Sequence, residues 1–221
     1  MKKQEILKLD GVGYRYSDAK KDEYVLKDIS YKFETGTIYA IKGKSGSGKT
    51  TLLSLISGLE KNYIGNIYYN DKDLKKVNLD KYRSQDIGIV FQSYNLLPHL
   101  TTFENITLSM DINHSKGYDK KKRVLELLKS VGLGEELANR RVLKLSGGEQ
   151  QRVAIARSLS YNPGMIIADE PTGNLDKETE NEIMKILTRL AHEEGKCVII
   201  VTHSDNVSEQ CDKVYELKTK K

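Results

Sequence analysis

The chain has 221 residues, of which 38% are hydrophobic and 30% are charged, with a formal net charge of +5. This length suits one well-cored domain or a domain with an inserted lobe, and the mixed charges are typical of a globular protein. The longest apolar runs, such as residues 198–201, fall far short of the ~20 residues that span a bilayer, which excludes a transmembrane helix. The N-terminus alternates apolar and polar residues instead of forming the core of a signal peptide, so we expect a cytoplasmic start.

The first elements predict a half-buried antiparallel sheet. A strand begins at Ile6 and ends near Gly11, and a second strand-like stretch covers residues 25–33 with apolar and polar residues mixed. Between them lies Tyr16. Its ring is open to two interpretations, ordinary packing or a platform on which a base stacks.

A glycine-rich loop follows the short strand predicted at residues 37–42. The loop reads GKSGSGKT from Gly43 to Thr50, and an apolar helix predicted to end at Leu59 follows it directly. It matches G-x-x-x-x-G-K-[ST] in the required context, in which backbone N–H groups wrap a polyphosphate. Lys49 would reach the outer phosphates and Thr50 would offer its hydroxyl to Mg²⁺. A chance glycine-rich loop is the alternative, and the flanking elements argue against it.

The middle of the chain predicts a helical lobe inserted between two strands of an α/β core. A strand at residues 87–91 ends at Gln92, and residues 93–163 then lack strand signals. One helix is predicted to begin at Thr102, and an amphipathic helix covers residues 120–131, where apolar residues recur at i, i+3, i+4 and i+7.

The lobe ends with the stretch LSGGEQQR, residues 145–152, which precedes a helical pattern. Ser146 stands where a helix cap would, and Gly147 and Gly148 allow a close approach of the backbone. A plain helix cap is one interpretation. The other is an anion site, because a helix N-terminus presents free N–H groups and a positive dipole end.

Polar side chains follow two apolar strands near the end of the chain. Residues 165–168 are apolar and lead into Asp169 and Glu170, while the apolar strand 197–201 leads to Thr202 and His203. Downstream of a phosphate loop, the first acid belongs on the Mg²⁺ shell and the second beside the γ-phosphate, where it polarises a water. His203 lies where parallel sheets keep their ligand sites, so we expect a polar contact to the phosphate or the water.

The order of these motifs resembles the ATP-binding subunit of an ABC transporter over nearly the whole chain. In order they are Tyr16, GKSGSGKT, Gln92, LSGGEQQR, MIIADE, the turn 174–176 and His203. The stretches FQSYNLLPHLT and DEPTGNLD are similar to the subfamily that serves lipoprotein release, macrolide export and antimicrobial-peptide export or resistance.

The resemblance implies an α/β fold of the P-loop NTPase class in a single domain over residues 1–221. Residues 1–92 and 164–221 would form a RecA-like core with an antiparallel β subdomain, and residues 93–163 would form the inserted helical subdomain that bears the signature.

It also implies an ATP hydrolase with ATP and Mg²⁺ as cofactors. Glu170 would act as general base, with His203, Lys49 and Gln92 completing the catalytic set, and Tyr16 would stack on adenine. Thr50, Gln92 and Asp169 would hold the metal or its waters. The nucleotide would be bound further by the loop, by the signature of a partner and by the cross-dimer turn: Gly43, Lys44, Ser45, Gly46, Ser47, Gly48, Lys49, Thr50, Thr51, Ser146, Gly147, Gly148 and Asp176.

The partners implied by the resemblance are a second copy of the chain and a membrane permease. The two copies would meet head to tail, each ATP lying between the phosphate loop of one and the Ser-Gly-Gly turn of the other. The permease would dock near residues 93–110, which places the subunit on the cytoplasmic face of the cell membrane as a peripheral protein, and no nucleic acid is expected. Two departures from the subfamily pattern, Lys44 and Val142, stand where proline is usual; Val142 lies in the stretch that communicates with the permease.

Two other functions are weighed against this one. A soluble ATPase of the same superfamily acting on ribosomes or DNA usually has two fused nucleotide domains or a long coiled coil, and this chain shows neither a second phosphate loop nor sustained heptads. A module that regulates a membrane signalling or cell-wall partner would carry the same catalytic residues. The identity of the partner separates this function from transport. A multi-span permease with a large extracytoplasmic domain favours export or release, and a signalling or cell-wall partner favours regulation.

Overall fold

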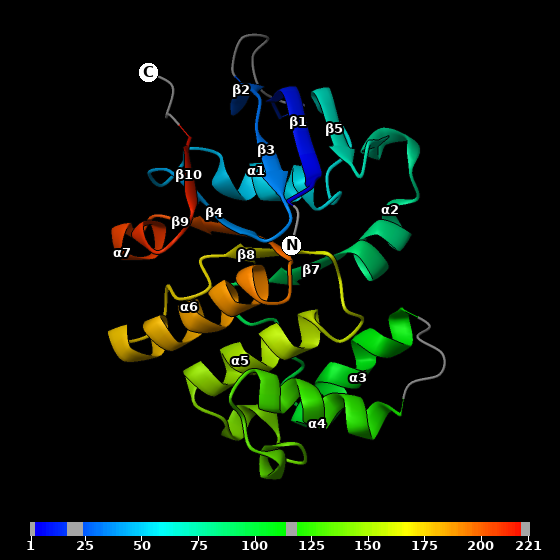
Figure 1. Ribbon diagram of the computed structural model, residues 1–221, viewed down its shortest axis with the longest axis vertical. Coiled ribbons are helices and arrows are strands. Elements are labelled where there is room, and N and C mark those ends of the chain that lie inside the picture. Colours follow the sequence, from blue (N-terminus) through cyan, green and yellow to red (C-terminus); the bar gives the residue numbers. More distant parts are fainter. Residues whose placement is uncertain (1–2, 17–23, 114–118, 218–221) are drawn as a thin grey trace.

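The structure is a computed structural model that describes residues 3–16, 24–113 and 119–217. Two sheets, one parallel and one antiparallel, lie in the upper half of Figure 1, and a group of helices lies below them. Across these described residues, none of the helices combines the length and the apolar character needed to cross a bilayer.

The central layer is a parallel sheet in the order β10-β4-β9-β8-β7. Three of its strands were predicted closely: β4 (Thr37–Lys42), β8 (Met165–Asp169) and β9 (Cys197–Thr202). Strand β7 (Ile87–Val90) ends one residue before the predicted end at Phe91. Strand β10 (Lys213–Glu216) was not anticipated from the sequence, because it is a largely exposed edge strand without an apolar run.

The second sheet is antiparallel and has the order β2-β1-β5-β6, with β3 also paired to β1. Its strands are β1 (Glu5–Tyr14), β2 (Leu26–Ile29), β3 (Lys32–Glu34), β5 (Ile64–Tyr69) and β6 (Lys72–Asp73). The prediction of one strand over residues 25–33 was wrong, since Ser30 and Tyr31 separate β2 from β3. Strand β1 continues past the predicted end at Gly11, where a positive φ of 59° accompanies a shift in the register with β5 between Asp10 and Gly13. Beyond Gly11, β1 pairs with β2 through Val12 and Tyr14.

Helices cover both faces of the parallel sheet. They are α1 (Lys49–Ile56), α2 (Leu79–Lys81), α3 (Thr102–Ile112), α4 (Lys120–Ser130), α5 (Gly147–Ser158), α6 (Lys177–His192) and α7 (Asp205–Glu209). Helix α1 ends before the predicted Leu59, because Gly58 takes a left-handed φ of 68° that stops the helix. Helix α3 begins at the predicted residue, with Thr101 as its cap and Glu104 closing a capping box.

The parallel sheet divides the core into two. On β8, Met165 and Ile167 join the cluster that contains α1 and the antiparallel sheet, whereas Ile166 and Ala168 join the cluster of helices α3 to α6. Strand β9 alternates in the same way. A strand that is buried on both faces carries a near-continuous apolar run, which explains why these strands were recognisable.

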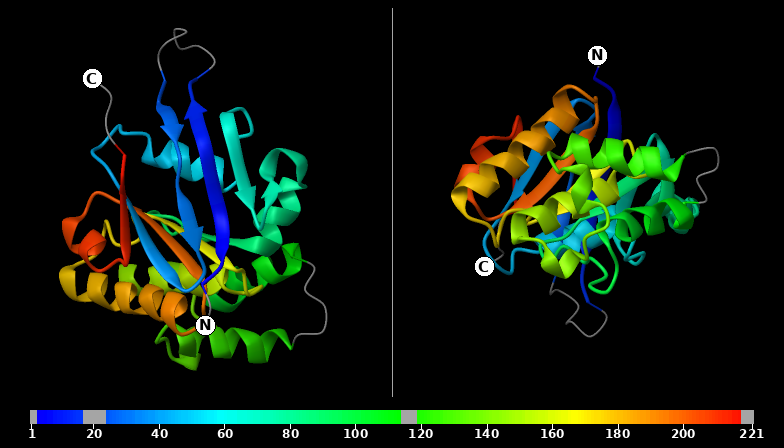
Figure 2. Two further views of the ribbon diagram at one scale, coloured as in Figure 1. Left: turned by 45° about the horizontal axis from the view of Figure 1, so that its top comes forward. Right: turned by 90° about the horizontal axis from the view of Figure 1, so that it is seen from below.

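Helices α3, α4 and α5 pack together at one end of the molecule, the green and yellow-green group at the bottom of Figure 1. Helix α5 of this group packs directly against β7, whereas α6 packs against β4 and β9, so the two helices lie side by side beneath the parallel sheet (Figure 2). Within the described part of residues 93–163, strand pairing is limited to one isolated bridge between Thr101 and Arg141.

A buried amide holds the loop that leads into α3. The Asn105 side chain, 1% exposed, accepts from the Leu97 N–H at 2.8 Å and donates to the carbonyls of Leu97 and Thr101 at 3.2 and 3.0 Å. The loop and the first turn of α3 are therefore fixed by one side chain.

Replacing Asn105 by Ala is expected to lower the free energy of unfolding by about 1–3 kcal/mol, since loop groups that bond the amide lose their partner. Urea unfolding measures the change. Asn139→Ala, at an exposed position, is the matched control and is expected to stay within about 0.5 kcal/mol of the parent. Equal unfolding midpoints for the two variants would contradict this account of the loop.

Candidate functional site

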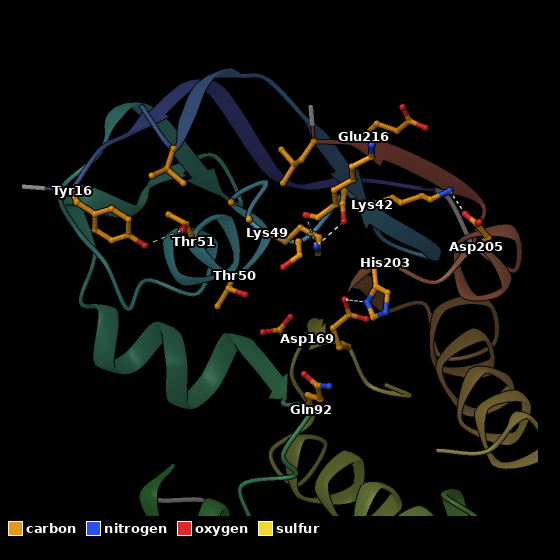
Figure 3. A pocket seen from close by; sticks show the side chains of 18 residues that line it. Tyr16, Lys42, Lys49, Thr50, Thr51, Gln92, Asp169, His203, Asp205 and Glu216 are labelled. Carbon is orange, nitrogen blue, oxygen red and sulfur yellow. Dashed lines mark hydrogen bonds and ion pairs between the residues drawn. The ribbon is translucent and has the colours of Figure 1, made fainter. Parts of the chain in front are cut away.

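A cavity of about 1270 Å³ opens at the carboxyl ends of β4, β8 and β9. This is the edge at which parallel α/β sheets hold their ligands. Figure 3 shows the side chains that line it, with Tyr16 at one end and His203 and Asp205 at the other. The lining includes these residues predicted from the sequence: Tyr16, Gly43, Lys44, Ser45, Gly46, Gly48, Lys49, Thr50, Thr51, Gln92, Asp169, Glu170 and His203.

The glycine-rich loop between β4 and α1 forms one wall of the cavity. Gly46 and Gly48 take φ values of 78° and 91°, which favour glycine, and a Cβ at Gly48 would stand 2.9 Å from a methyl group of Leu26. Gly48 caps α1 without a side-chain hydrogen bond, and the first turn of the helix holds no acidic residue. The N–H groups and the positive dipole end of α1 therefore suit an anion.

The charged and polar groups of the loop fit a polyphosphate. The Lys49 ammonium donates to the carbonyls of Gly43 and Lys44 at 2.7 and 3.1 Å, so it lies across the loop. Ser47, 4% exposed, does not line the cavity, and its hydroxyl has no hydrogen-bond partner among the described residues. The donor set that faces the cavity is therefore the helix amides and Lys49, which phosphate oxygens require, and the structure does not bring the Ser47 side chain into it.

Two carboxylates face the loop from the end of β8. Burial, with the neighbouring charge of Glu170, raises the pKa of the Asp169 carboxyl above its usual range, while Lys49 opposes the shift. Such a perturbed acid in a cavity is a recognised mark of a functional site.

The Glu170 side chain is held on both of its oxygens. Thr202 Oγ1 donates to one oxygen at 3.0 Å, and His203 Nδ1 lies 2.7 Å from the other. The Glu170 N–H donates to the Val201 carbonyl at 2.8 Å, and the residue has a left-handed φ of 43°. Sequence reasoning assigned no role to Thr202, although a hydroxyl at the end of an apolar strand beside His203 was the available signal.

The residues proposed for Mg²⁺ come from three elements. Thr50 lies in α1, Asp169 ends β8, and Gln92 follows β7. The Gln92 amide packs against Gly173: a Cβ on Gly173 would stand 2.9 Å from the Gln92 amide nitrogen. Figure 3 shows all three on the cavity wall. In the described part of the chain, no three His, Cys, Asp or Glu residues gather as a metal cage. The set fits Mg²⁺, which takes few protein ligands and keeps phosphate and water oxygens.

Tyr16 lies at the far end of the cavity. Its ring is 52% exposed, packs edge-on against Tyr14 at 5.3 Å, and brings its hydroxyl to 3.5 Å from Thr51 Oγ1. An exposed ring that lines the cavity is consistent with stacking on a base, and the edge-on contact leaves room for it.

Three charged residues of the lining were not anticipated from the sequence. Lys42, the last residue of β4, forms an ion pair with Asp205 at the start of α7, and Glu216 lies nearby on β10. Lys42 directly precedes the glycine-rich loop, and Asp205 follows His203 by two positions, but neither matches a motif. Glu216 could not have been found, because its strand was not predicted.

The signature residues lie outside this cavity. Ser146 caps α5: its hydroxyl accepts from the Glu149 N–H at 3.2 Å, and its own N–H donates to the Glu149 carboxylate at 2.7 Å. Within a single chain, the plain helix-cap interpretation is therefore correct. The Ser146 residue is exposed.

Asp176 also lies outside the cavity, at the cap of α6, and it is next to the start of α5. Its carboxylate accepts two bonds from Thr179, both at 2.9 Å, which lowers the pKa of Asp176 below its usual range. A Cβ at Gly148 would stand 2.5 Å from Thr179, so the beginnings of α5 and α6 are in contact. The two caps together form an exposed surface separate from the cavity.

Comparison with known proteins gives concordant matches. The model of the ABC transporter family matches residues 26–173. The chain is 45% identical to the uncharacterized ABC transporter ATP-binding protein YclH of Bacillus subtilis, over 94% of this chain and 91% of the relative. It is 39% identical to the lipoprotein-releasing system ATP-binding protein LolD of Francisella tularensis, over 96% of this chain and 93% of the relative.

A solved structure also matches. It is the dimeric structure of MJ0796, a bacterial ABC transporter cassette, with a TM-score of 0.86, 40% identity, and coverage of 97% of this chain and 95% of that chain. A second dimeric structure of MJ0796, in a post-hydrolysis state with ADP and Pi, has a TM-score of 0.87.

The two left-handed glycines of the loop make a matched pair of substitutions. Gly46→Ala is expected to lower the free energy of unfolding by about 1–2 kcal/mol through backbone strain alone, because no atom lies within 4 Å of its added Cβ. Gly48→Ala adds a clash with Leu26 and Val25 and is expected to cost at least ~1 kcal/mol more. Chemical unfolding without nucleotide compares them, and equal losses would show that the described loop packing is incorrect.

Proposed function

This chain belongs to the ABC transporter family, and we propose that two copies of it close head to tail around two Mg-ATP and power a separate membrane permease. The chain is an ATP-binding subunit with the P-loop NTPase fold, and it is an ATP hydrolase that uses Mg²⁺. The proposal adds the arrangement of the copies, the roles of single residues and the class of transport.

The observation that carries the proposed dimer is the separation of the signature from the cavity. Ser146, Gly147, Gly148 and Asp176 do not line the cavity in which the loop and the acids meet, yet Ser146 and Asp176 are exposed. A second copy can bring this surface to the open side of the cavity. The relative MJ0796 is dimeric, which supports the same assembly here.

Nucleotide binding is assigned to the cavity. The N–H groups of the loop and of the first turn of α1 would hold phosphate oxygens, and Lys49 would leave the carbonyls of Gly43 and Lys44 for the outer phosphates. Tyr16 would stack on adenine, with Thr51 beside its hydroxyl. Thr50, Gln92 and Asp169 would hold Mg²⁺, which would supply positive charge beside the phosphates.

The hydrolytic step is assigned to Glu170. Its carboxylate is oriented by the hydroxyl of Thr202 and by His203, so it can direct a water at the γ-phosphate and accept the proton. His203 is 67% exposed at its side chain and lies at the cavity edge, where it can contact the γ-phosphate and act as a switch. Because catalysis of phosphoryl transfer is mainly positioning and charge stabilisation, the fixed orientation of Glu170 is the main contribution of these contacts.

The permease is proposed to dock near residues 93–110, in the helical subdomain that we assign to residues 93–163. This segment exposes Leu97 and Leu108, at 38% and 39%, and Asn105 holds its loop in one conformation. Such docking would place the subunit on the cytoplasmic face of the membrane. The name of LolD, a lipoprotein-releasing system protein, supports export or release of a peptide, lipid-linked or drug-like substrate.

Glu170→Gln tests the proposed function. It removes the base while keeping the side-chain size, so turnover is expected to fall at least ~100-fold. Because the variant would only slowly hydrolyse the Mg-ATP that it binds, the nucleotide should keep it dimeric. Analytical ultracentrifugation detects the dimer. Turnover at the parent rate would exclude Glu170 as the base, and a monomer at saturating Mg-ATP would exclude the dimer.

Ser146→Arg tests the role of the signature. A bulky cation on this exposed turn is expected to block the approach of a partner, so turnover should fall to background while ATP binding by the monomer stays within about threefold of the parent. Steady-state ATPase measurements and titration with a fluorescent ATP analogue separate the two effects. Ser146→Thr keeps the capping hydroxyl and is the control for loss of the cap. Loss of ATP binding by the Ser146→Arg monomer would place the signature in the monomer's own site.

A further inference from the structure

The loop that carries Gln92 is held in a conformation that its own residues disfavour. Tyr94 and Asn95 are consecutive and left-handed, with φ values of 59° and 49°. Asparagine adopts this region fairly readily but tyrosine rarely does, so contacts with the rest of the fold must stabilise Tyr94. Bonds inside the loop, from Tyr94 N to the Phe91 carbonyl and from Asn95 N to the Ser93 carbonyl, tighten the turn without attaching it to a helix.

One arginine attaches this turn to helix α5. The Arg157 guanidinium donates through Nη1 to the Asn95 carbonyl at 2.5 Å and through Nη2 to the Tyr94 carbonyl at 2.9 Å. The planar fork of an arginine matches two neighbouring acceptors, and the single ammonium of a lysine does not. Arg157 lies in the last turn of α5 and is half-buried, and its bond to the Tyr94 carbonyl is more enclosed than its bond to the Asn95 carbonyl.

The same loop touches the other end of α5. Gly147 is the first residue of α5, directly after the cap Ser146. The Tyr94 hydroxyl lies close to it: a Cβ on Gly147 would stand only 3.0 Å from this hydroxyl. The loop is therefore in contact with α5 near both ends, and Gln92 at its start faces the cavity. A helix of 12 residues is a rigid rod, so its orientation at Arg157 determines where Ser146 points.

We propose that Arg157 is a positioning residue that locks helix α5 to the Gln92 loop and thereby sets the orientation in which Ser146 meets the ATP of a partner copy. The inference rests on the proposed dimer. It assigns to Arg157 a contribution to dimer closure and turnover that is separate from nucleotide binding by a single chain.

The test uses Arg157→Lys and Arg157→Gln in the Glu170→Gln protein with Mg-ATP. Both are expected to raise the dimer dissociation constant in analytical ultracentrifugation by about tenfold or more, because two hydrogen bonds from a charged donor are lost. Binding of a fluorescent ATP analogue, measured below the concentration of dimerisation, is expected to stay within about threefold of the parent. In the protein with Glu170 intact, turnover should fall with dimerisation.

Arg189→Gln is the matched control. Arg189 also donates to a backbone carbonyl, that of Ser130 at 2.7 Å, but it lies on α6 away from the Gln92 loop. It is expected to dimerise like the parent, and thermal unfolding verifies that each variant is folded. Two outcomes would overturn this inference and leave the proposed dimer standing. In one, both Arg157 variants dimerise like the parent. In the other, they lose nucleotide binding and dimerisation to the same extent. A Glu170→Gln parent that stays monomeric overturns the proposed dimer and this inference with it.

Discussion

The burial of the parallel sheet on both faces is the constraint on which the rest of the structure depends. Alternate residues of β8 and β9 enter the two separate cores, so these strands have no face on which a polar side chain is tolerated. Polar groups are consequently confined to the strand ends. Asp169, Thr202 and the glycine-rich loop after β4 all lie at the same edge, because the strands are parallel and in register. The site therefore lies at the carboxyl ends of the strands, where the sheet no longer requires apolar side chains.

The lysine of the glycine-rich loop is not neutralised by the two acids at the end of β8. Lys49 donates to backbone carbonyls, and among the described residues it forms no ion pair with Asp169 or Glu170. Burial raises the pKa of Asp169, which means that its charged form is disfavoured in the folded chain without a cation. The Glu170 side chain, by contrast, is held in place by contacts with Thr202 and His203. Within residues 3–16, 24–113 and 119–217, Asp169 has no hydrogen-bond donor to its side chain, whereas the proposed base is oriented before any ligand binds.

The elements that were predictable from the sequence are those in which a local pattern coincides with burial. The strands β4, β8 and β9 carry such patterns, whereas the largely exposed loop at residues 43–50 was recognised from its motif and the start of α3 from its helix-capping residues. Strand β10 carries no such pattern: Tyr215 stacks on Tyr31 at 4.0 Å, and its hydroxyl donates to the Lys32 carbonyl at 2.8 Å, so contacts with distant residues stabilise this strand. The same reason explains why Lys42 and Glu216 were missed. Their position at the cavity follows from the sheet order, which no local pattern encodes.

The Ser-Gly-Gly turn shows that a motif can have a structural explanation and still be functional. Gly147 and Gly148 are required within a single chain, because side chains there would meet Tyr94 and Thr179. The glycines alone therefore do not argue for a ligand. The capping box likewise uses Ser146 and Glu149 for a purely local purpose. What argues for a partner is the exposure of Ser146 and Asp176 on adjoining helix starts, outside a cavity that already holds every other proposed contact except the buried Ser47. A second copy that presents its bound phosphates to this surface would complete both sites at once.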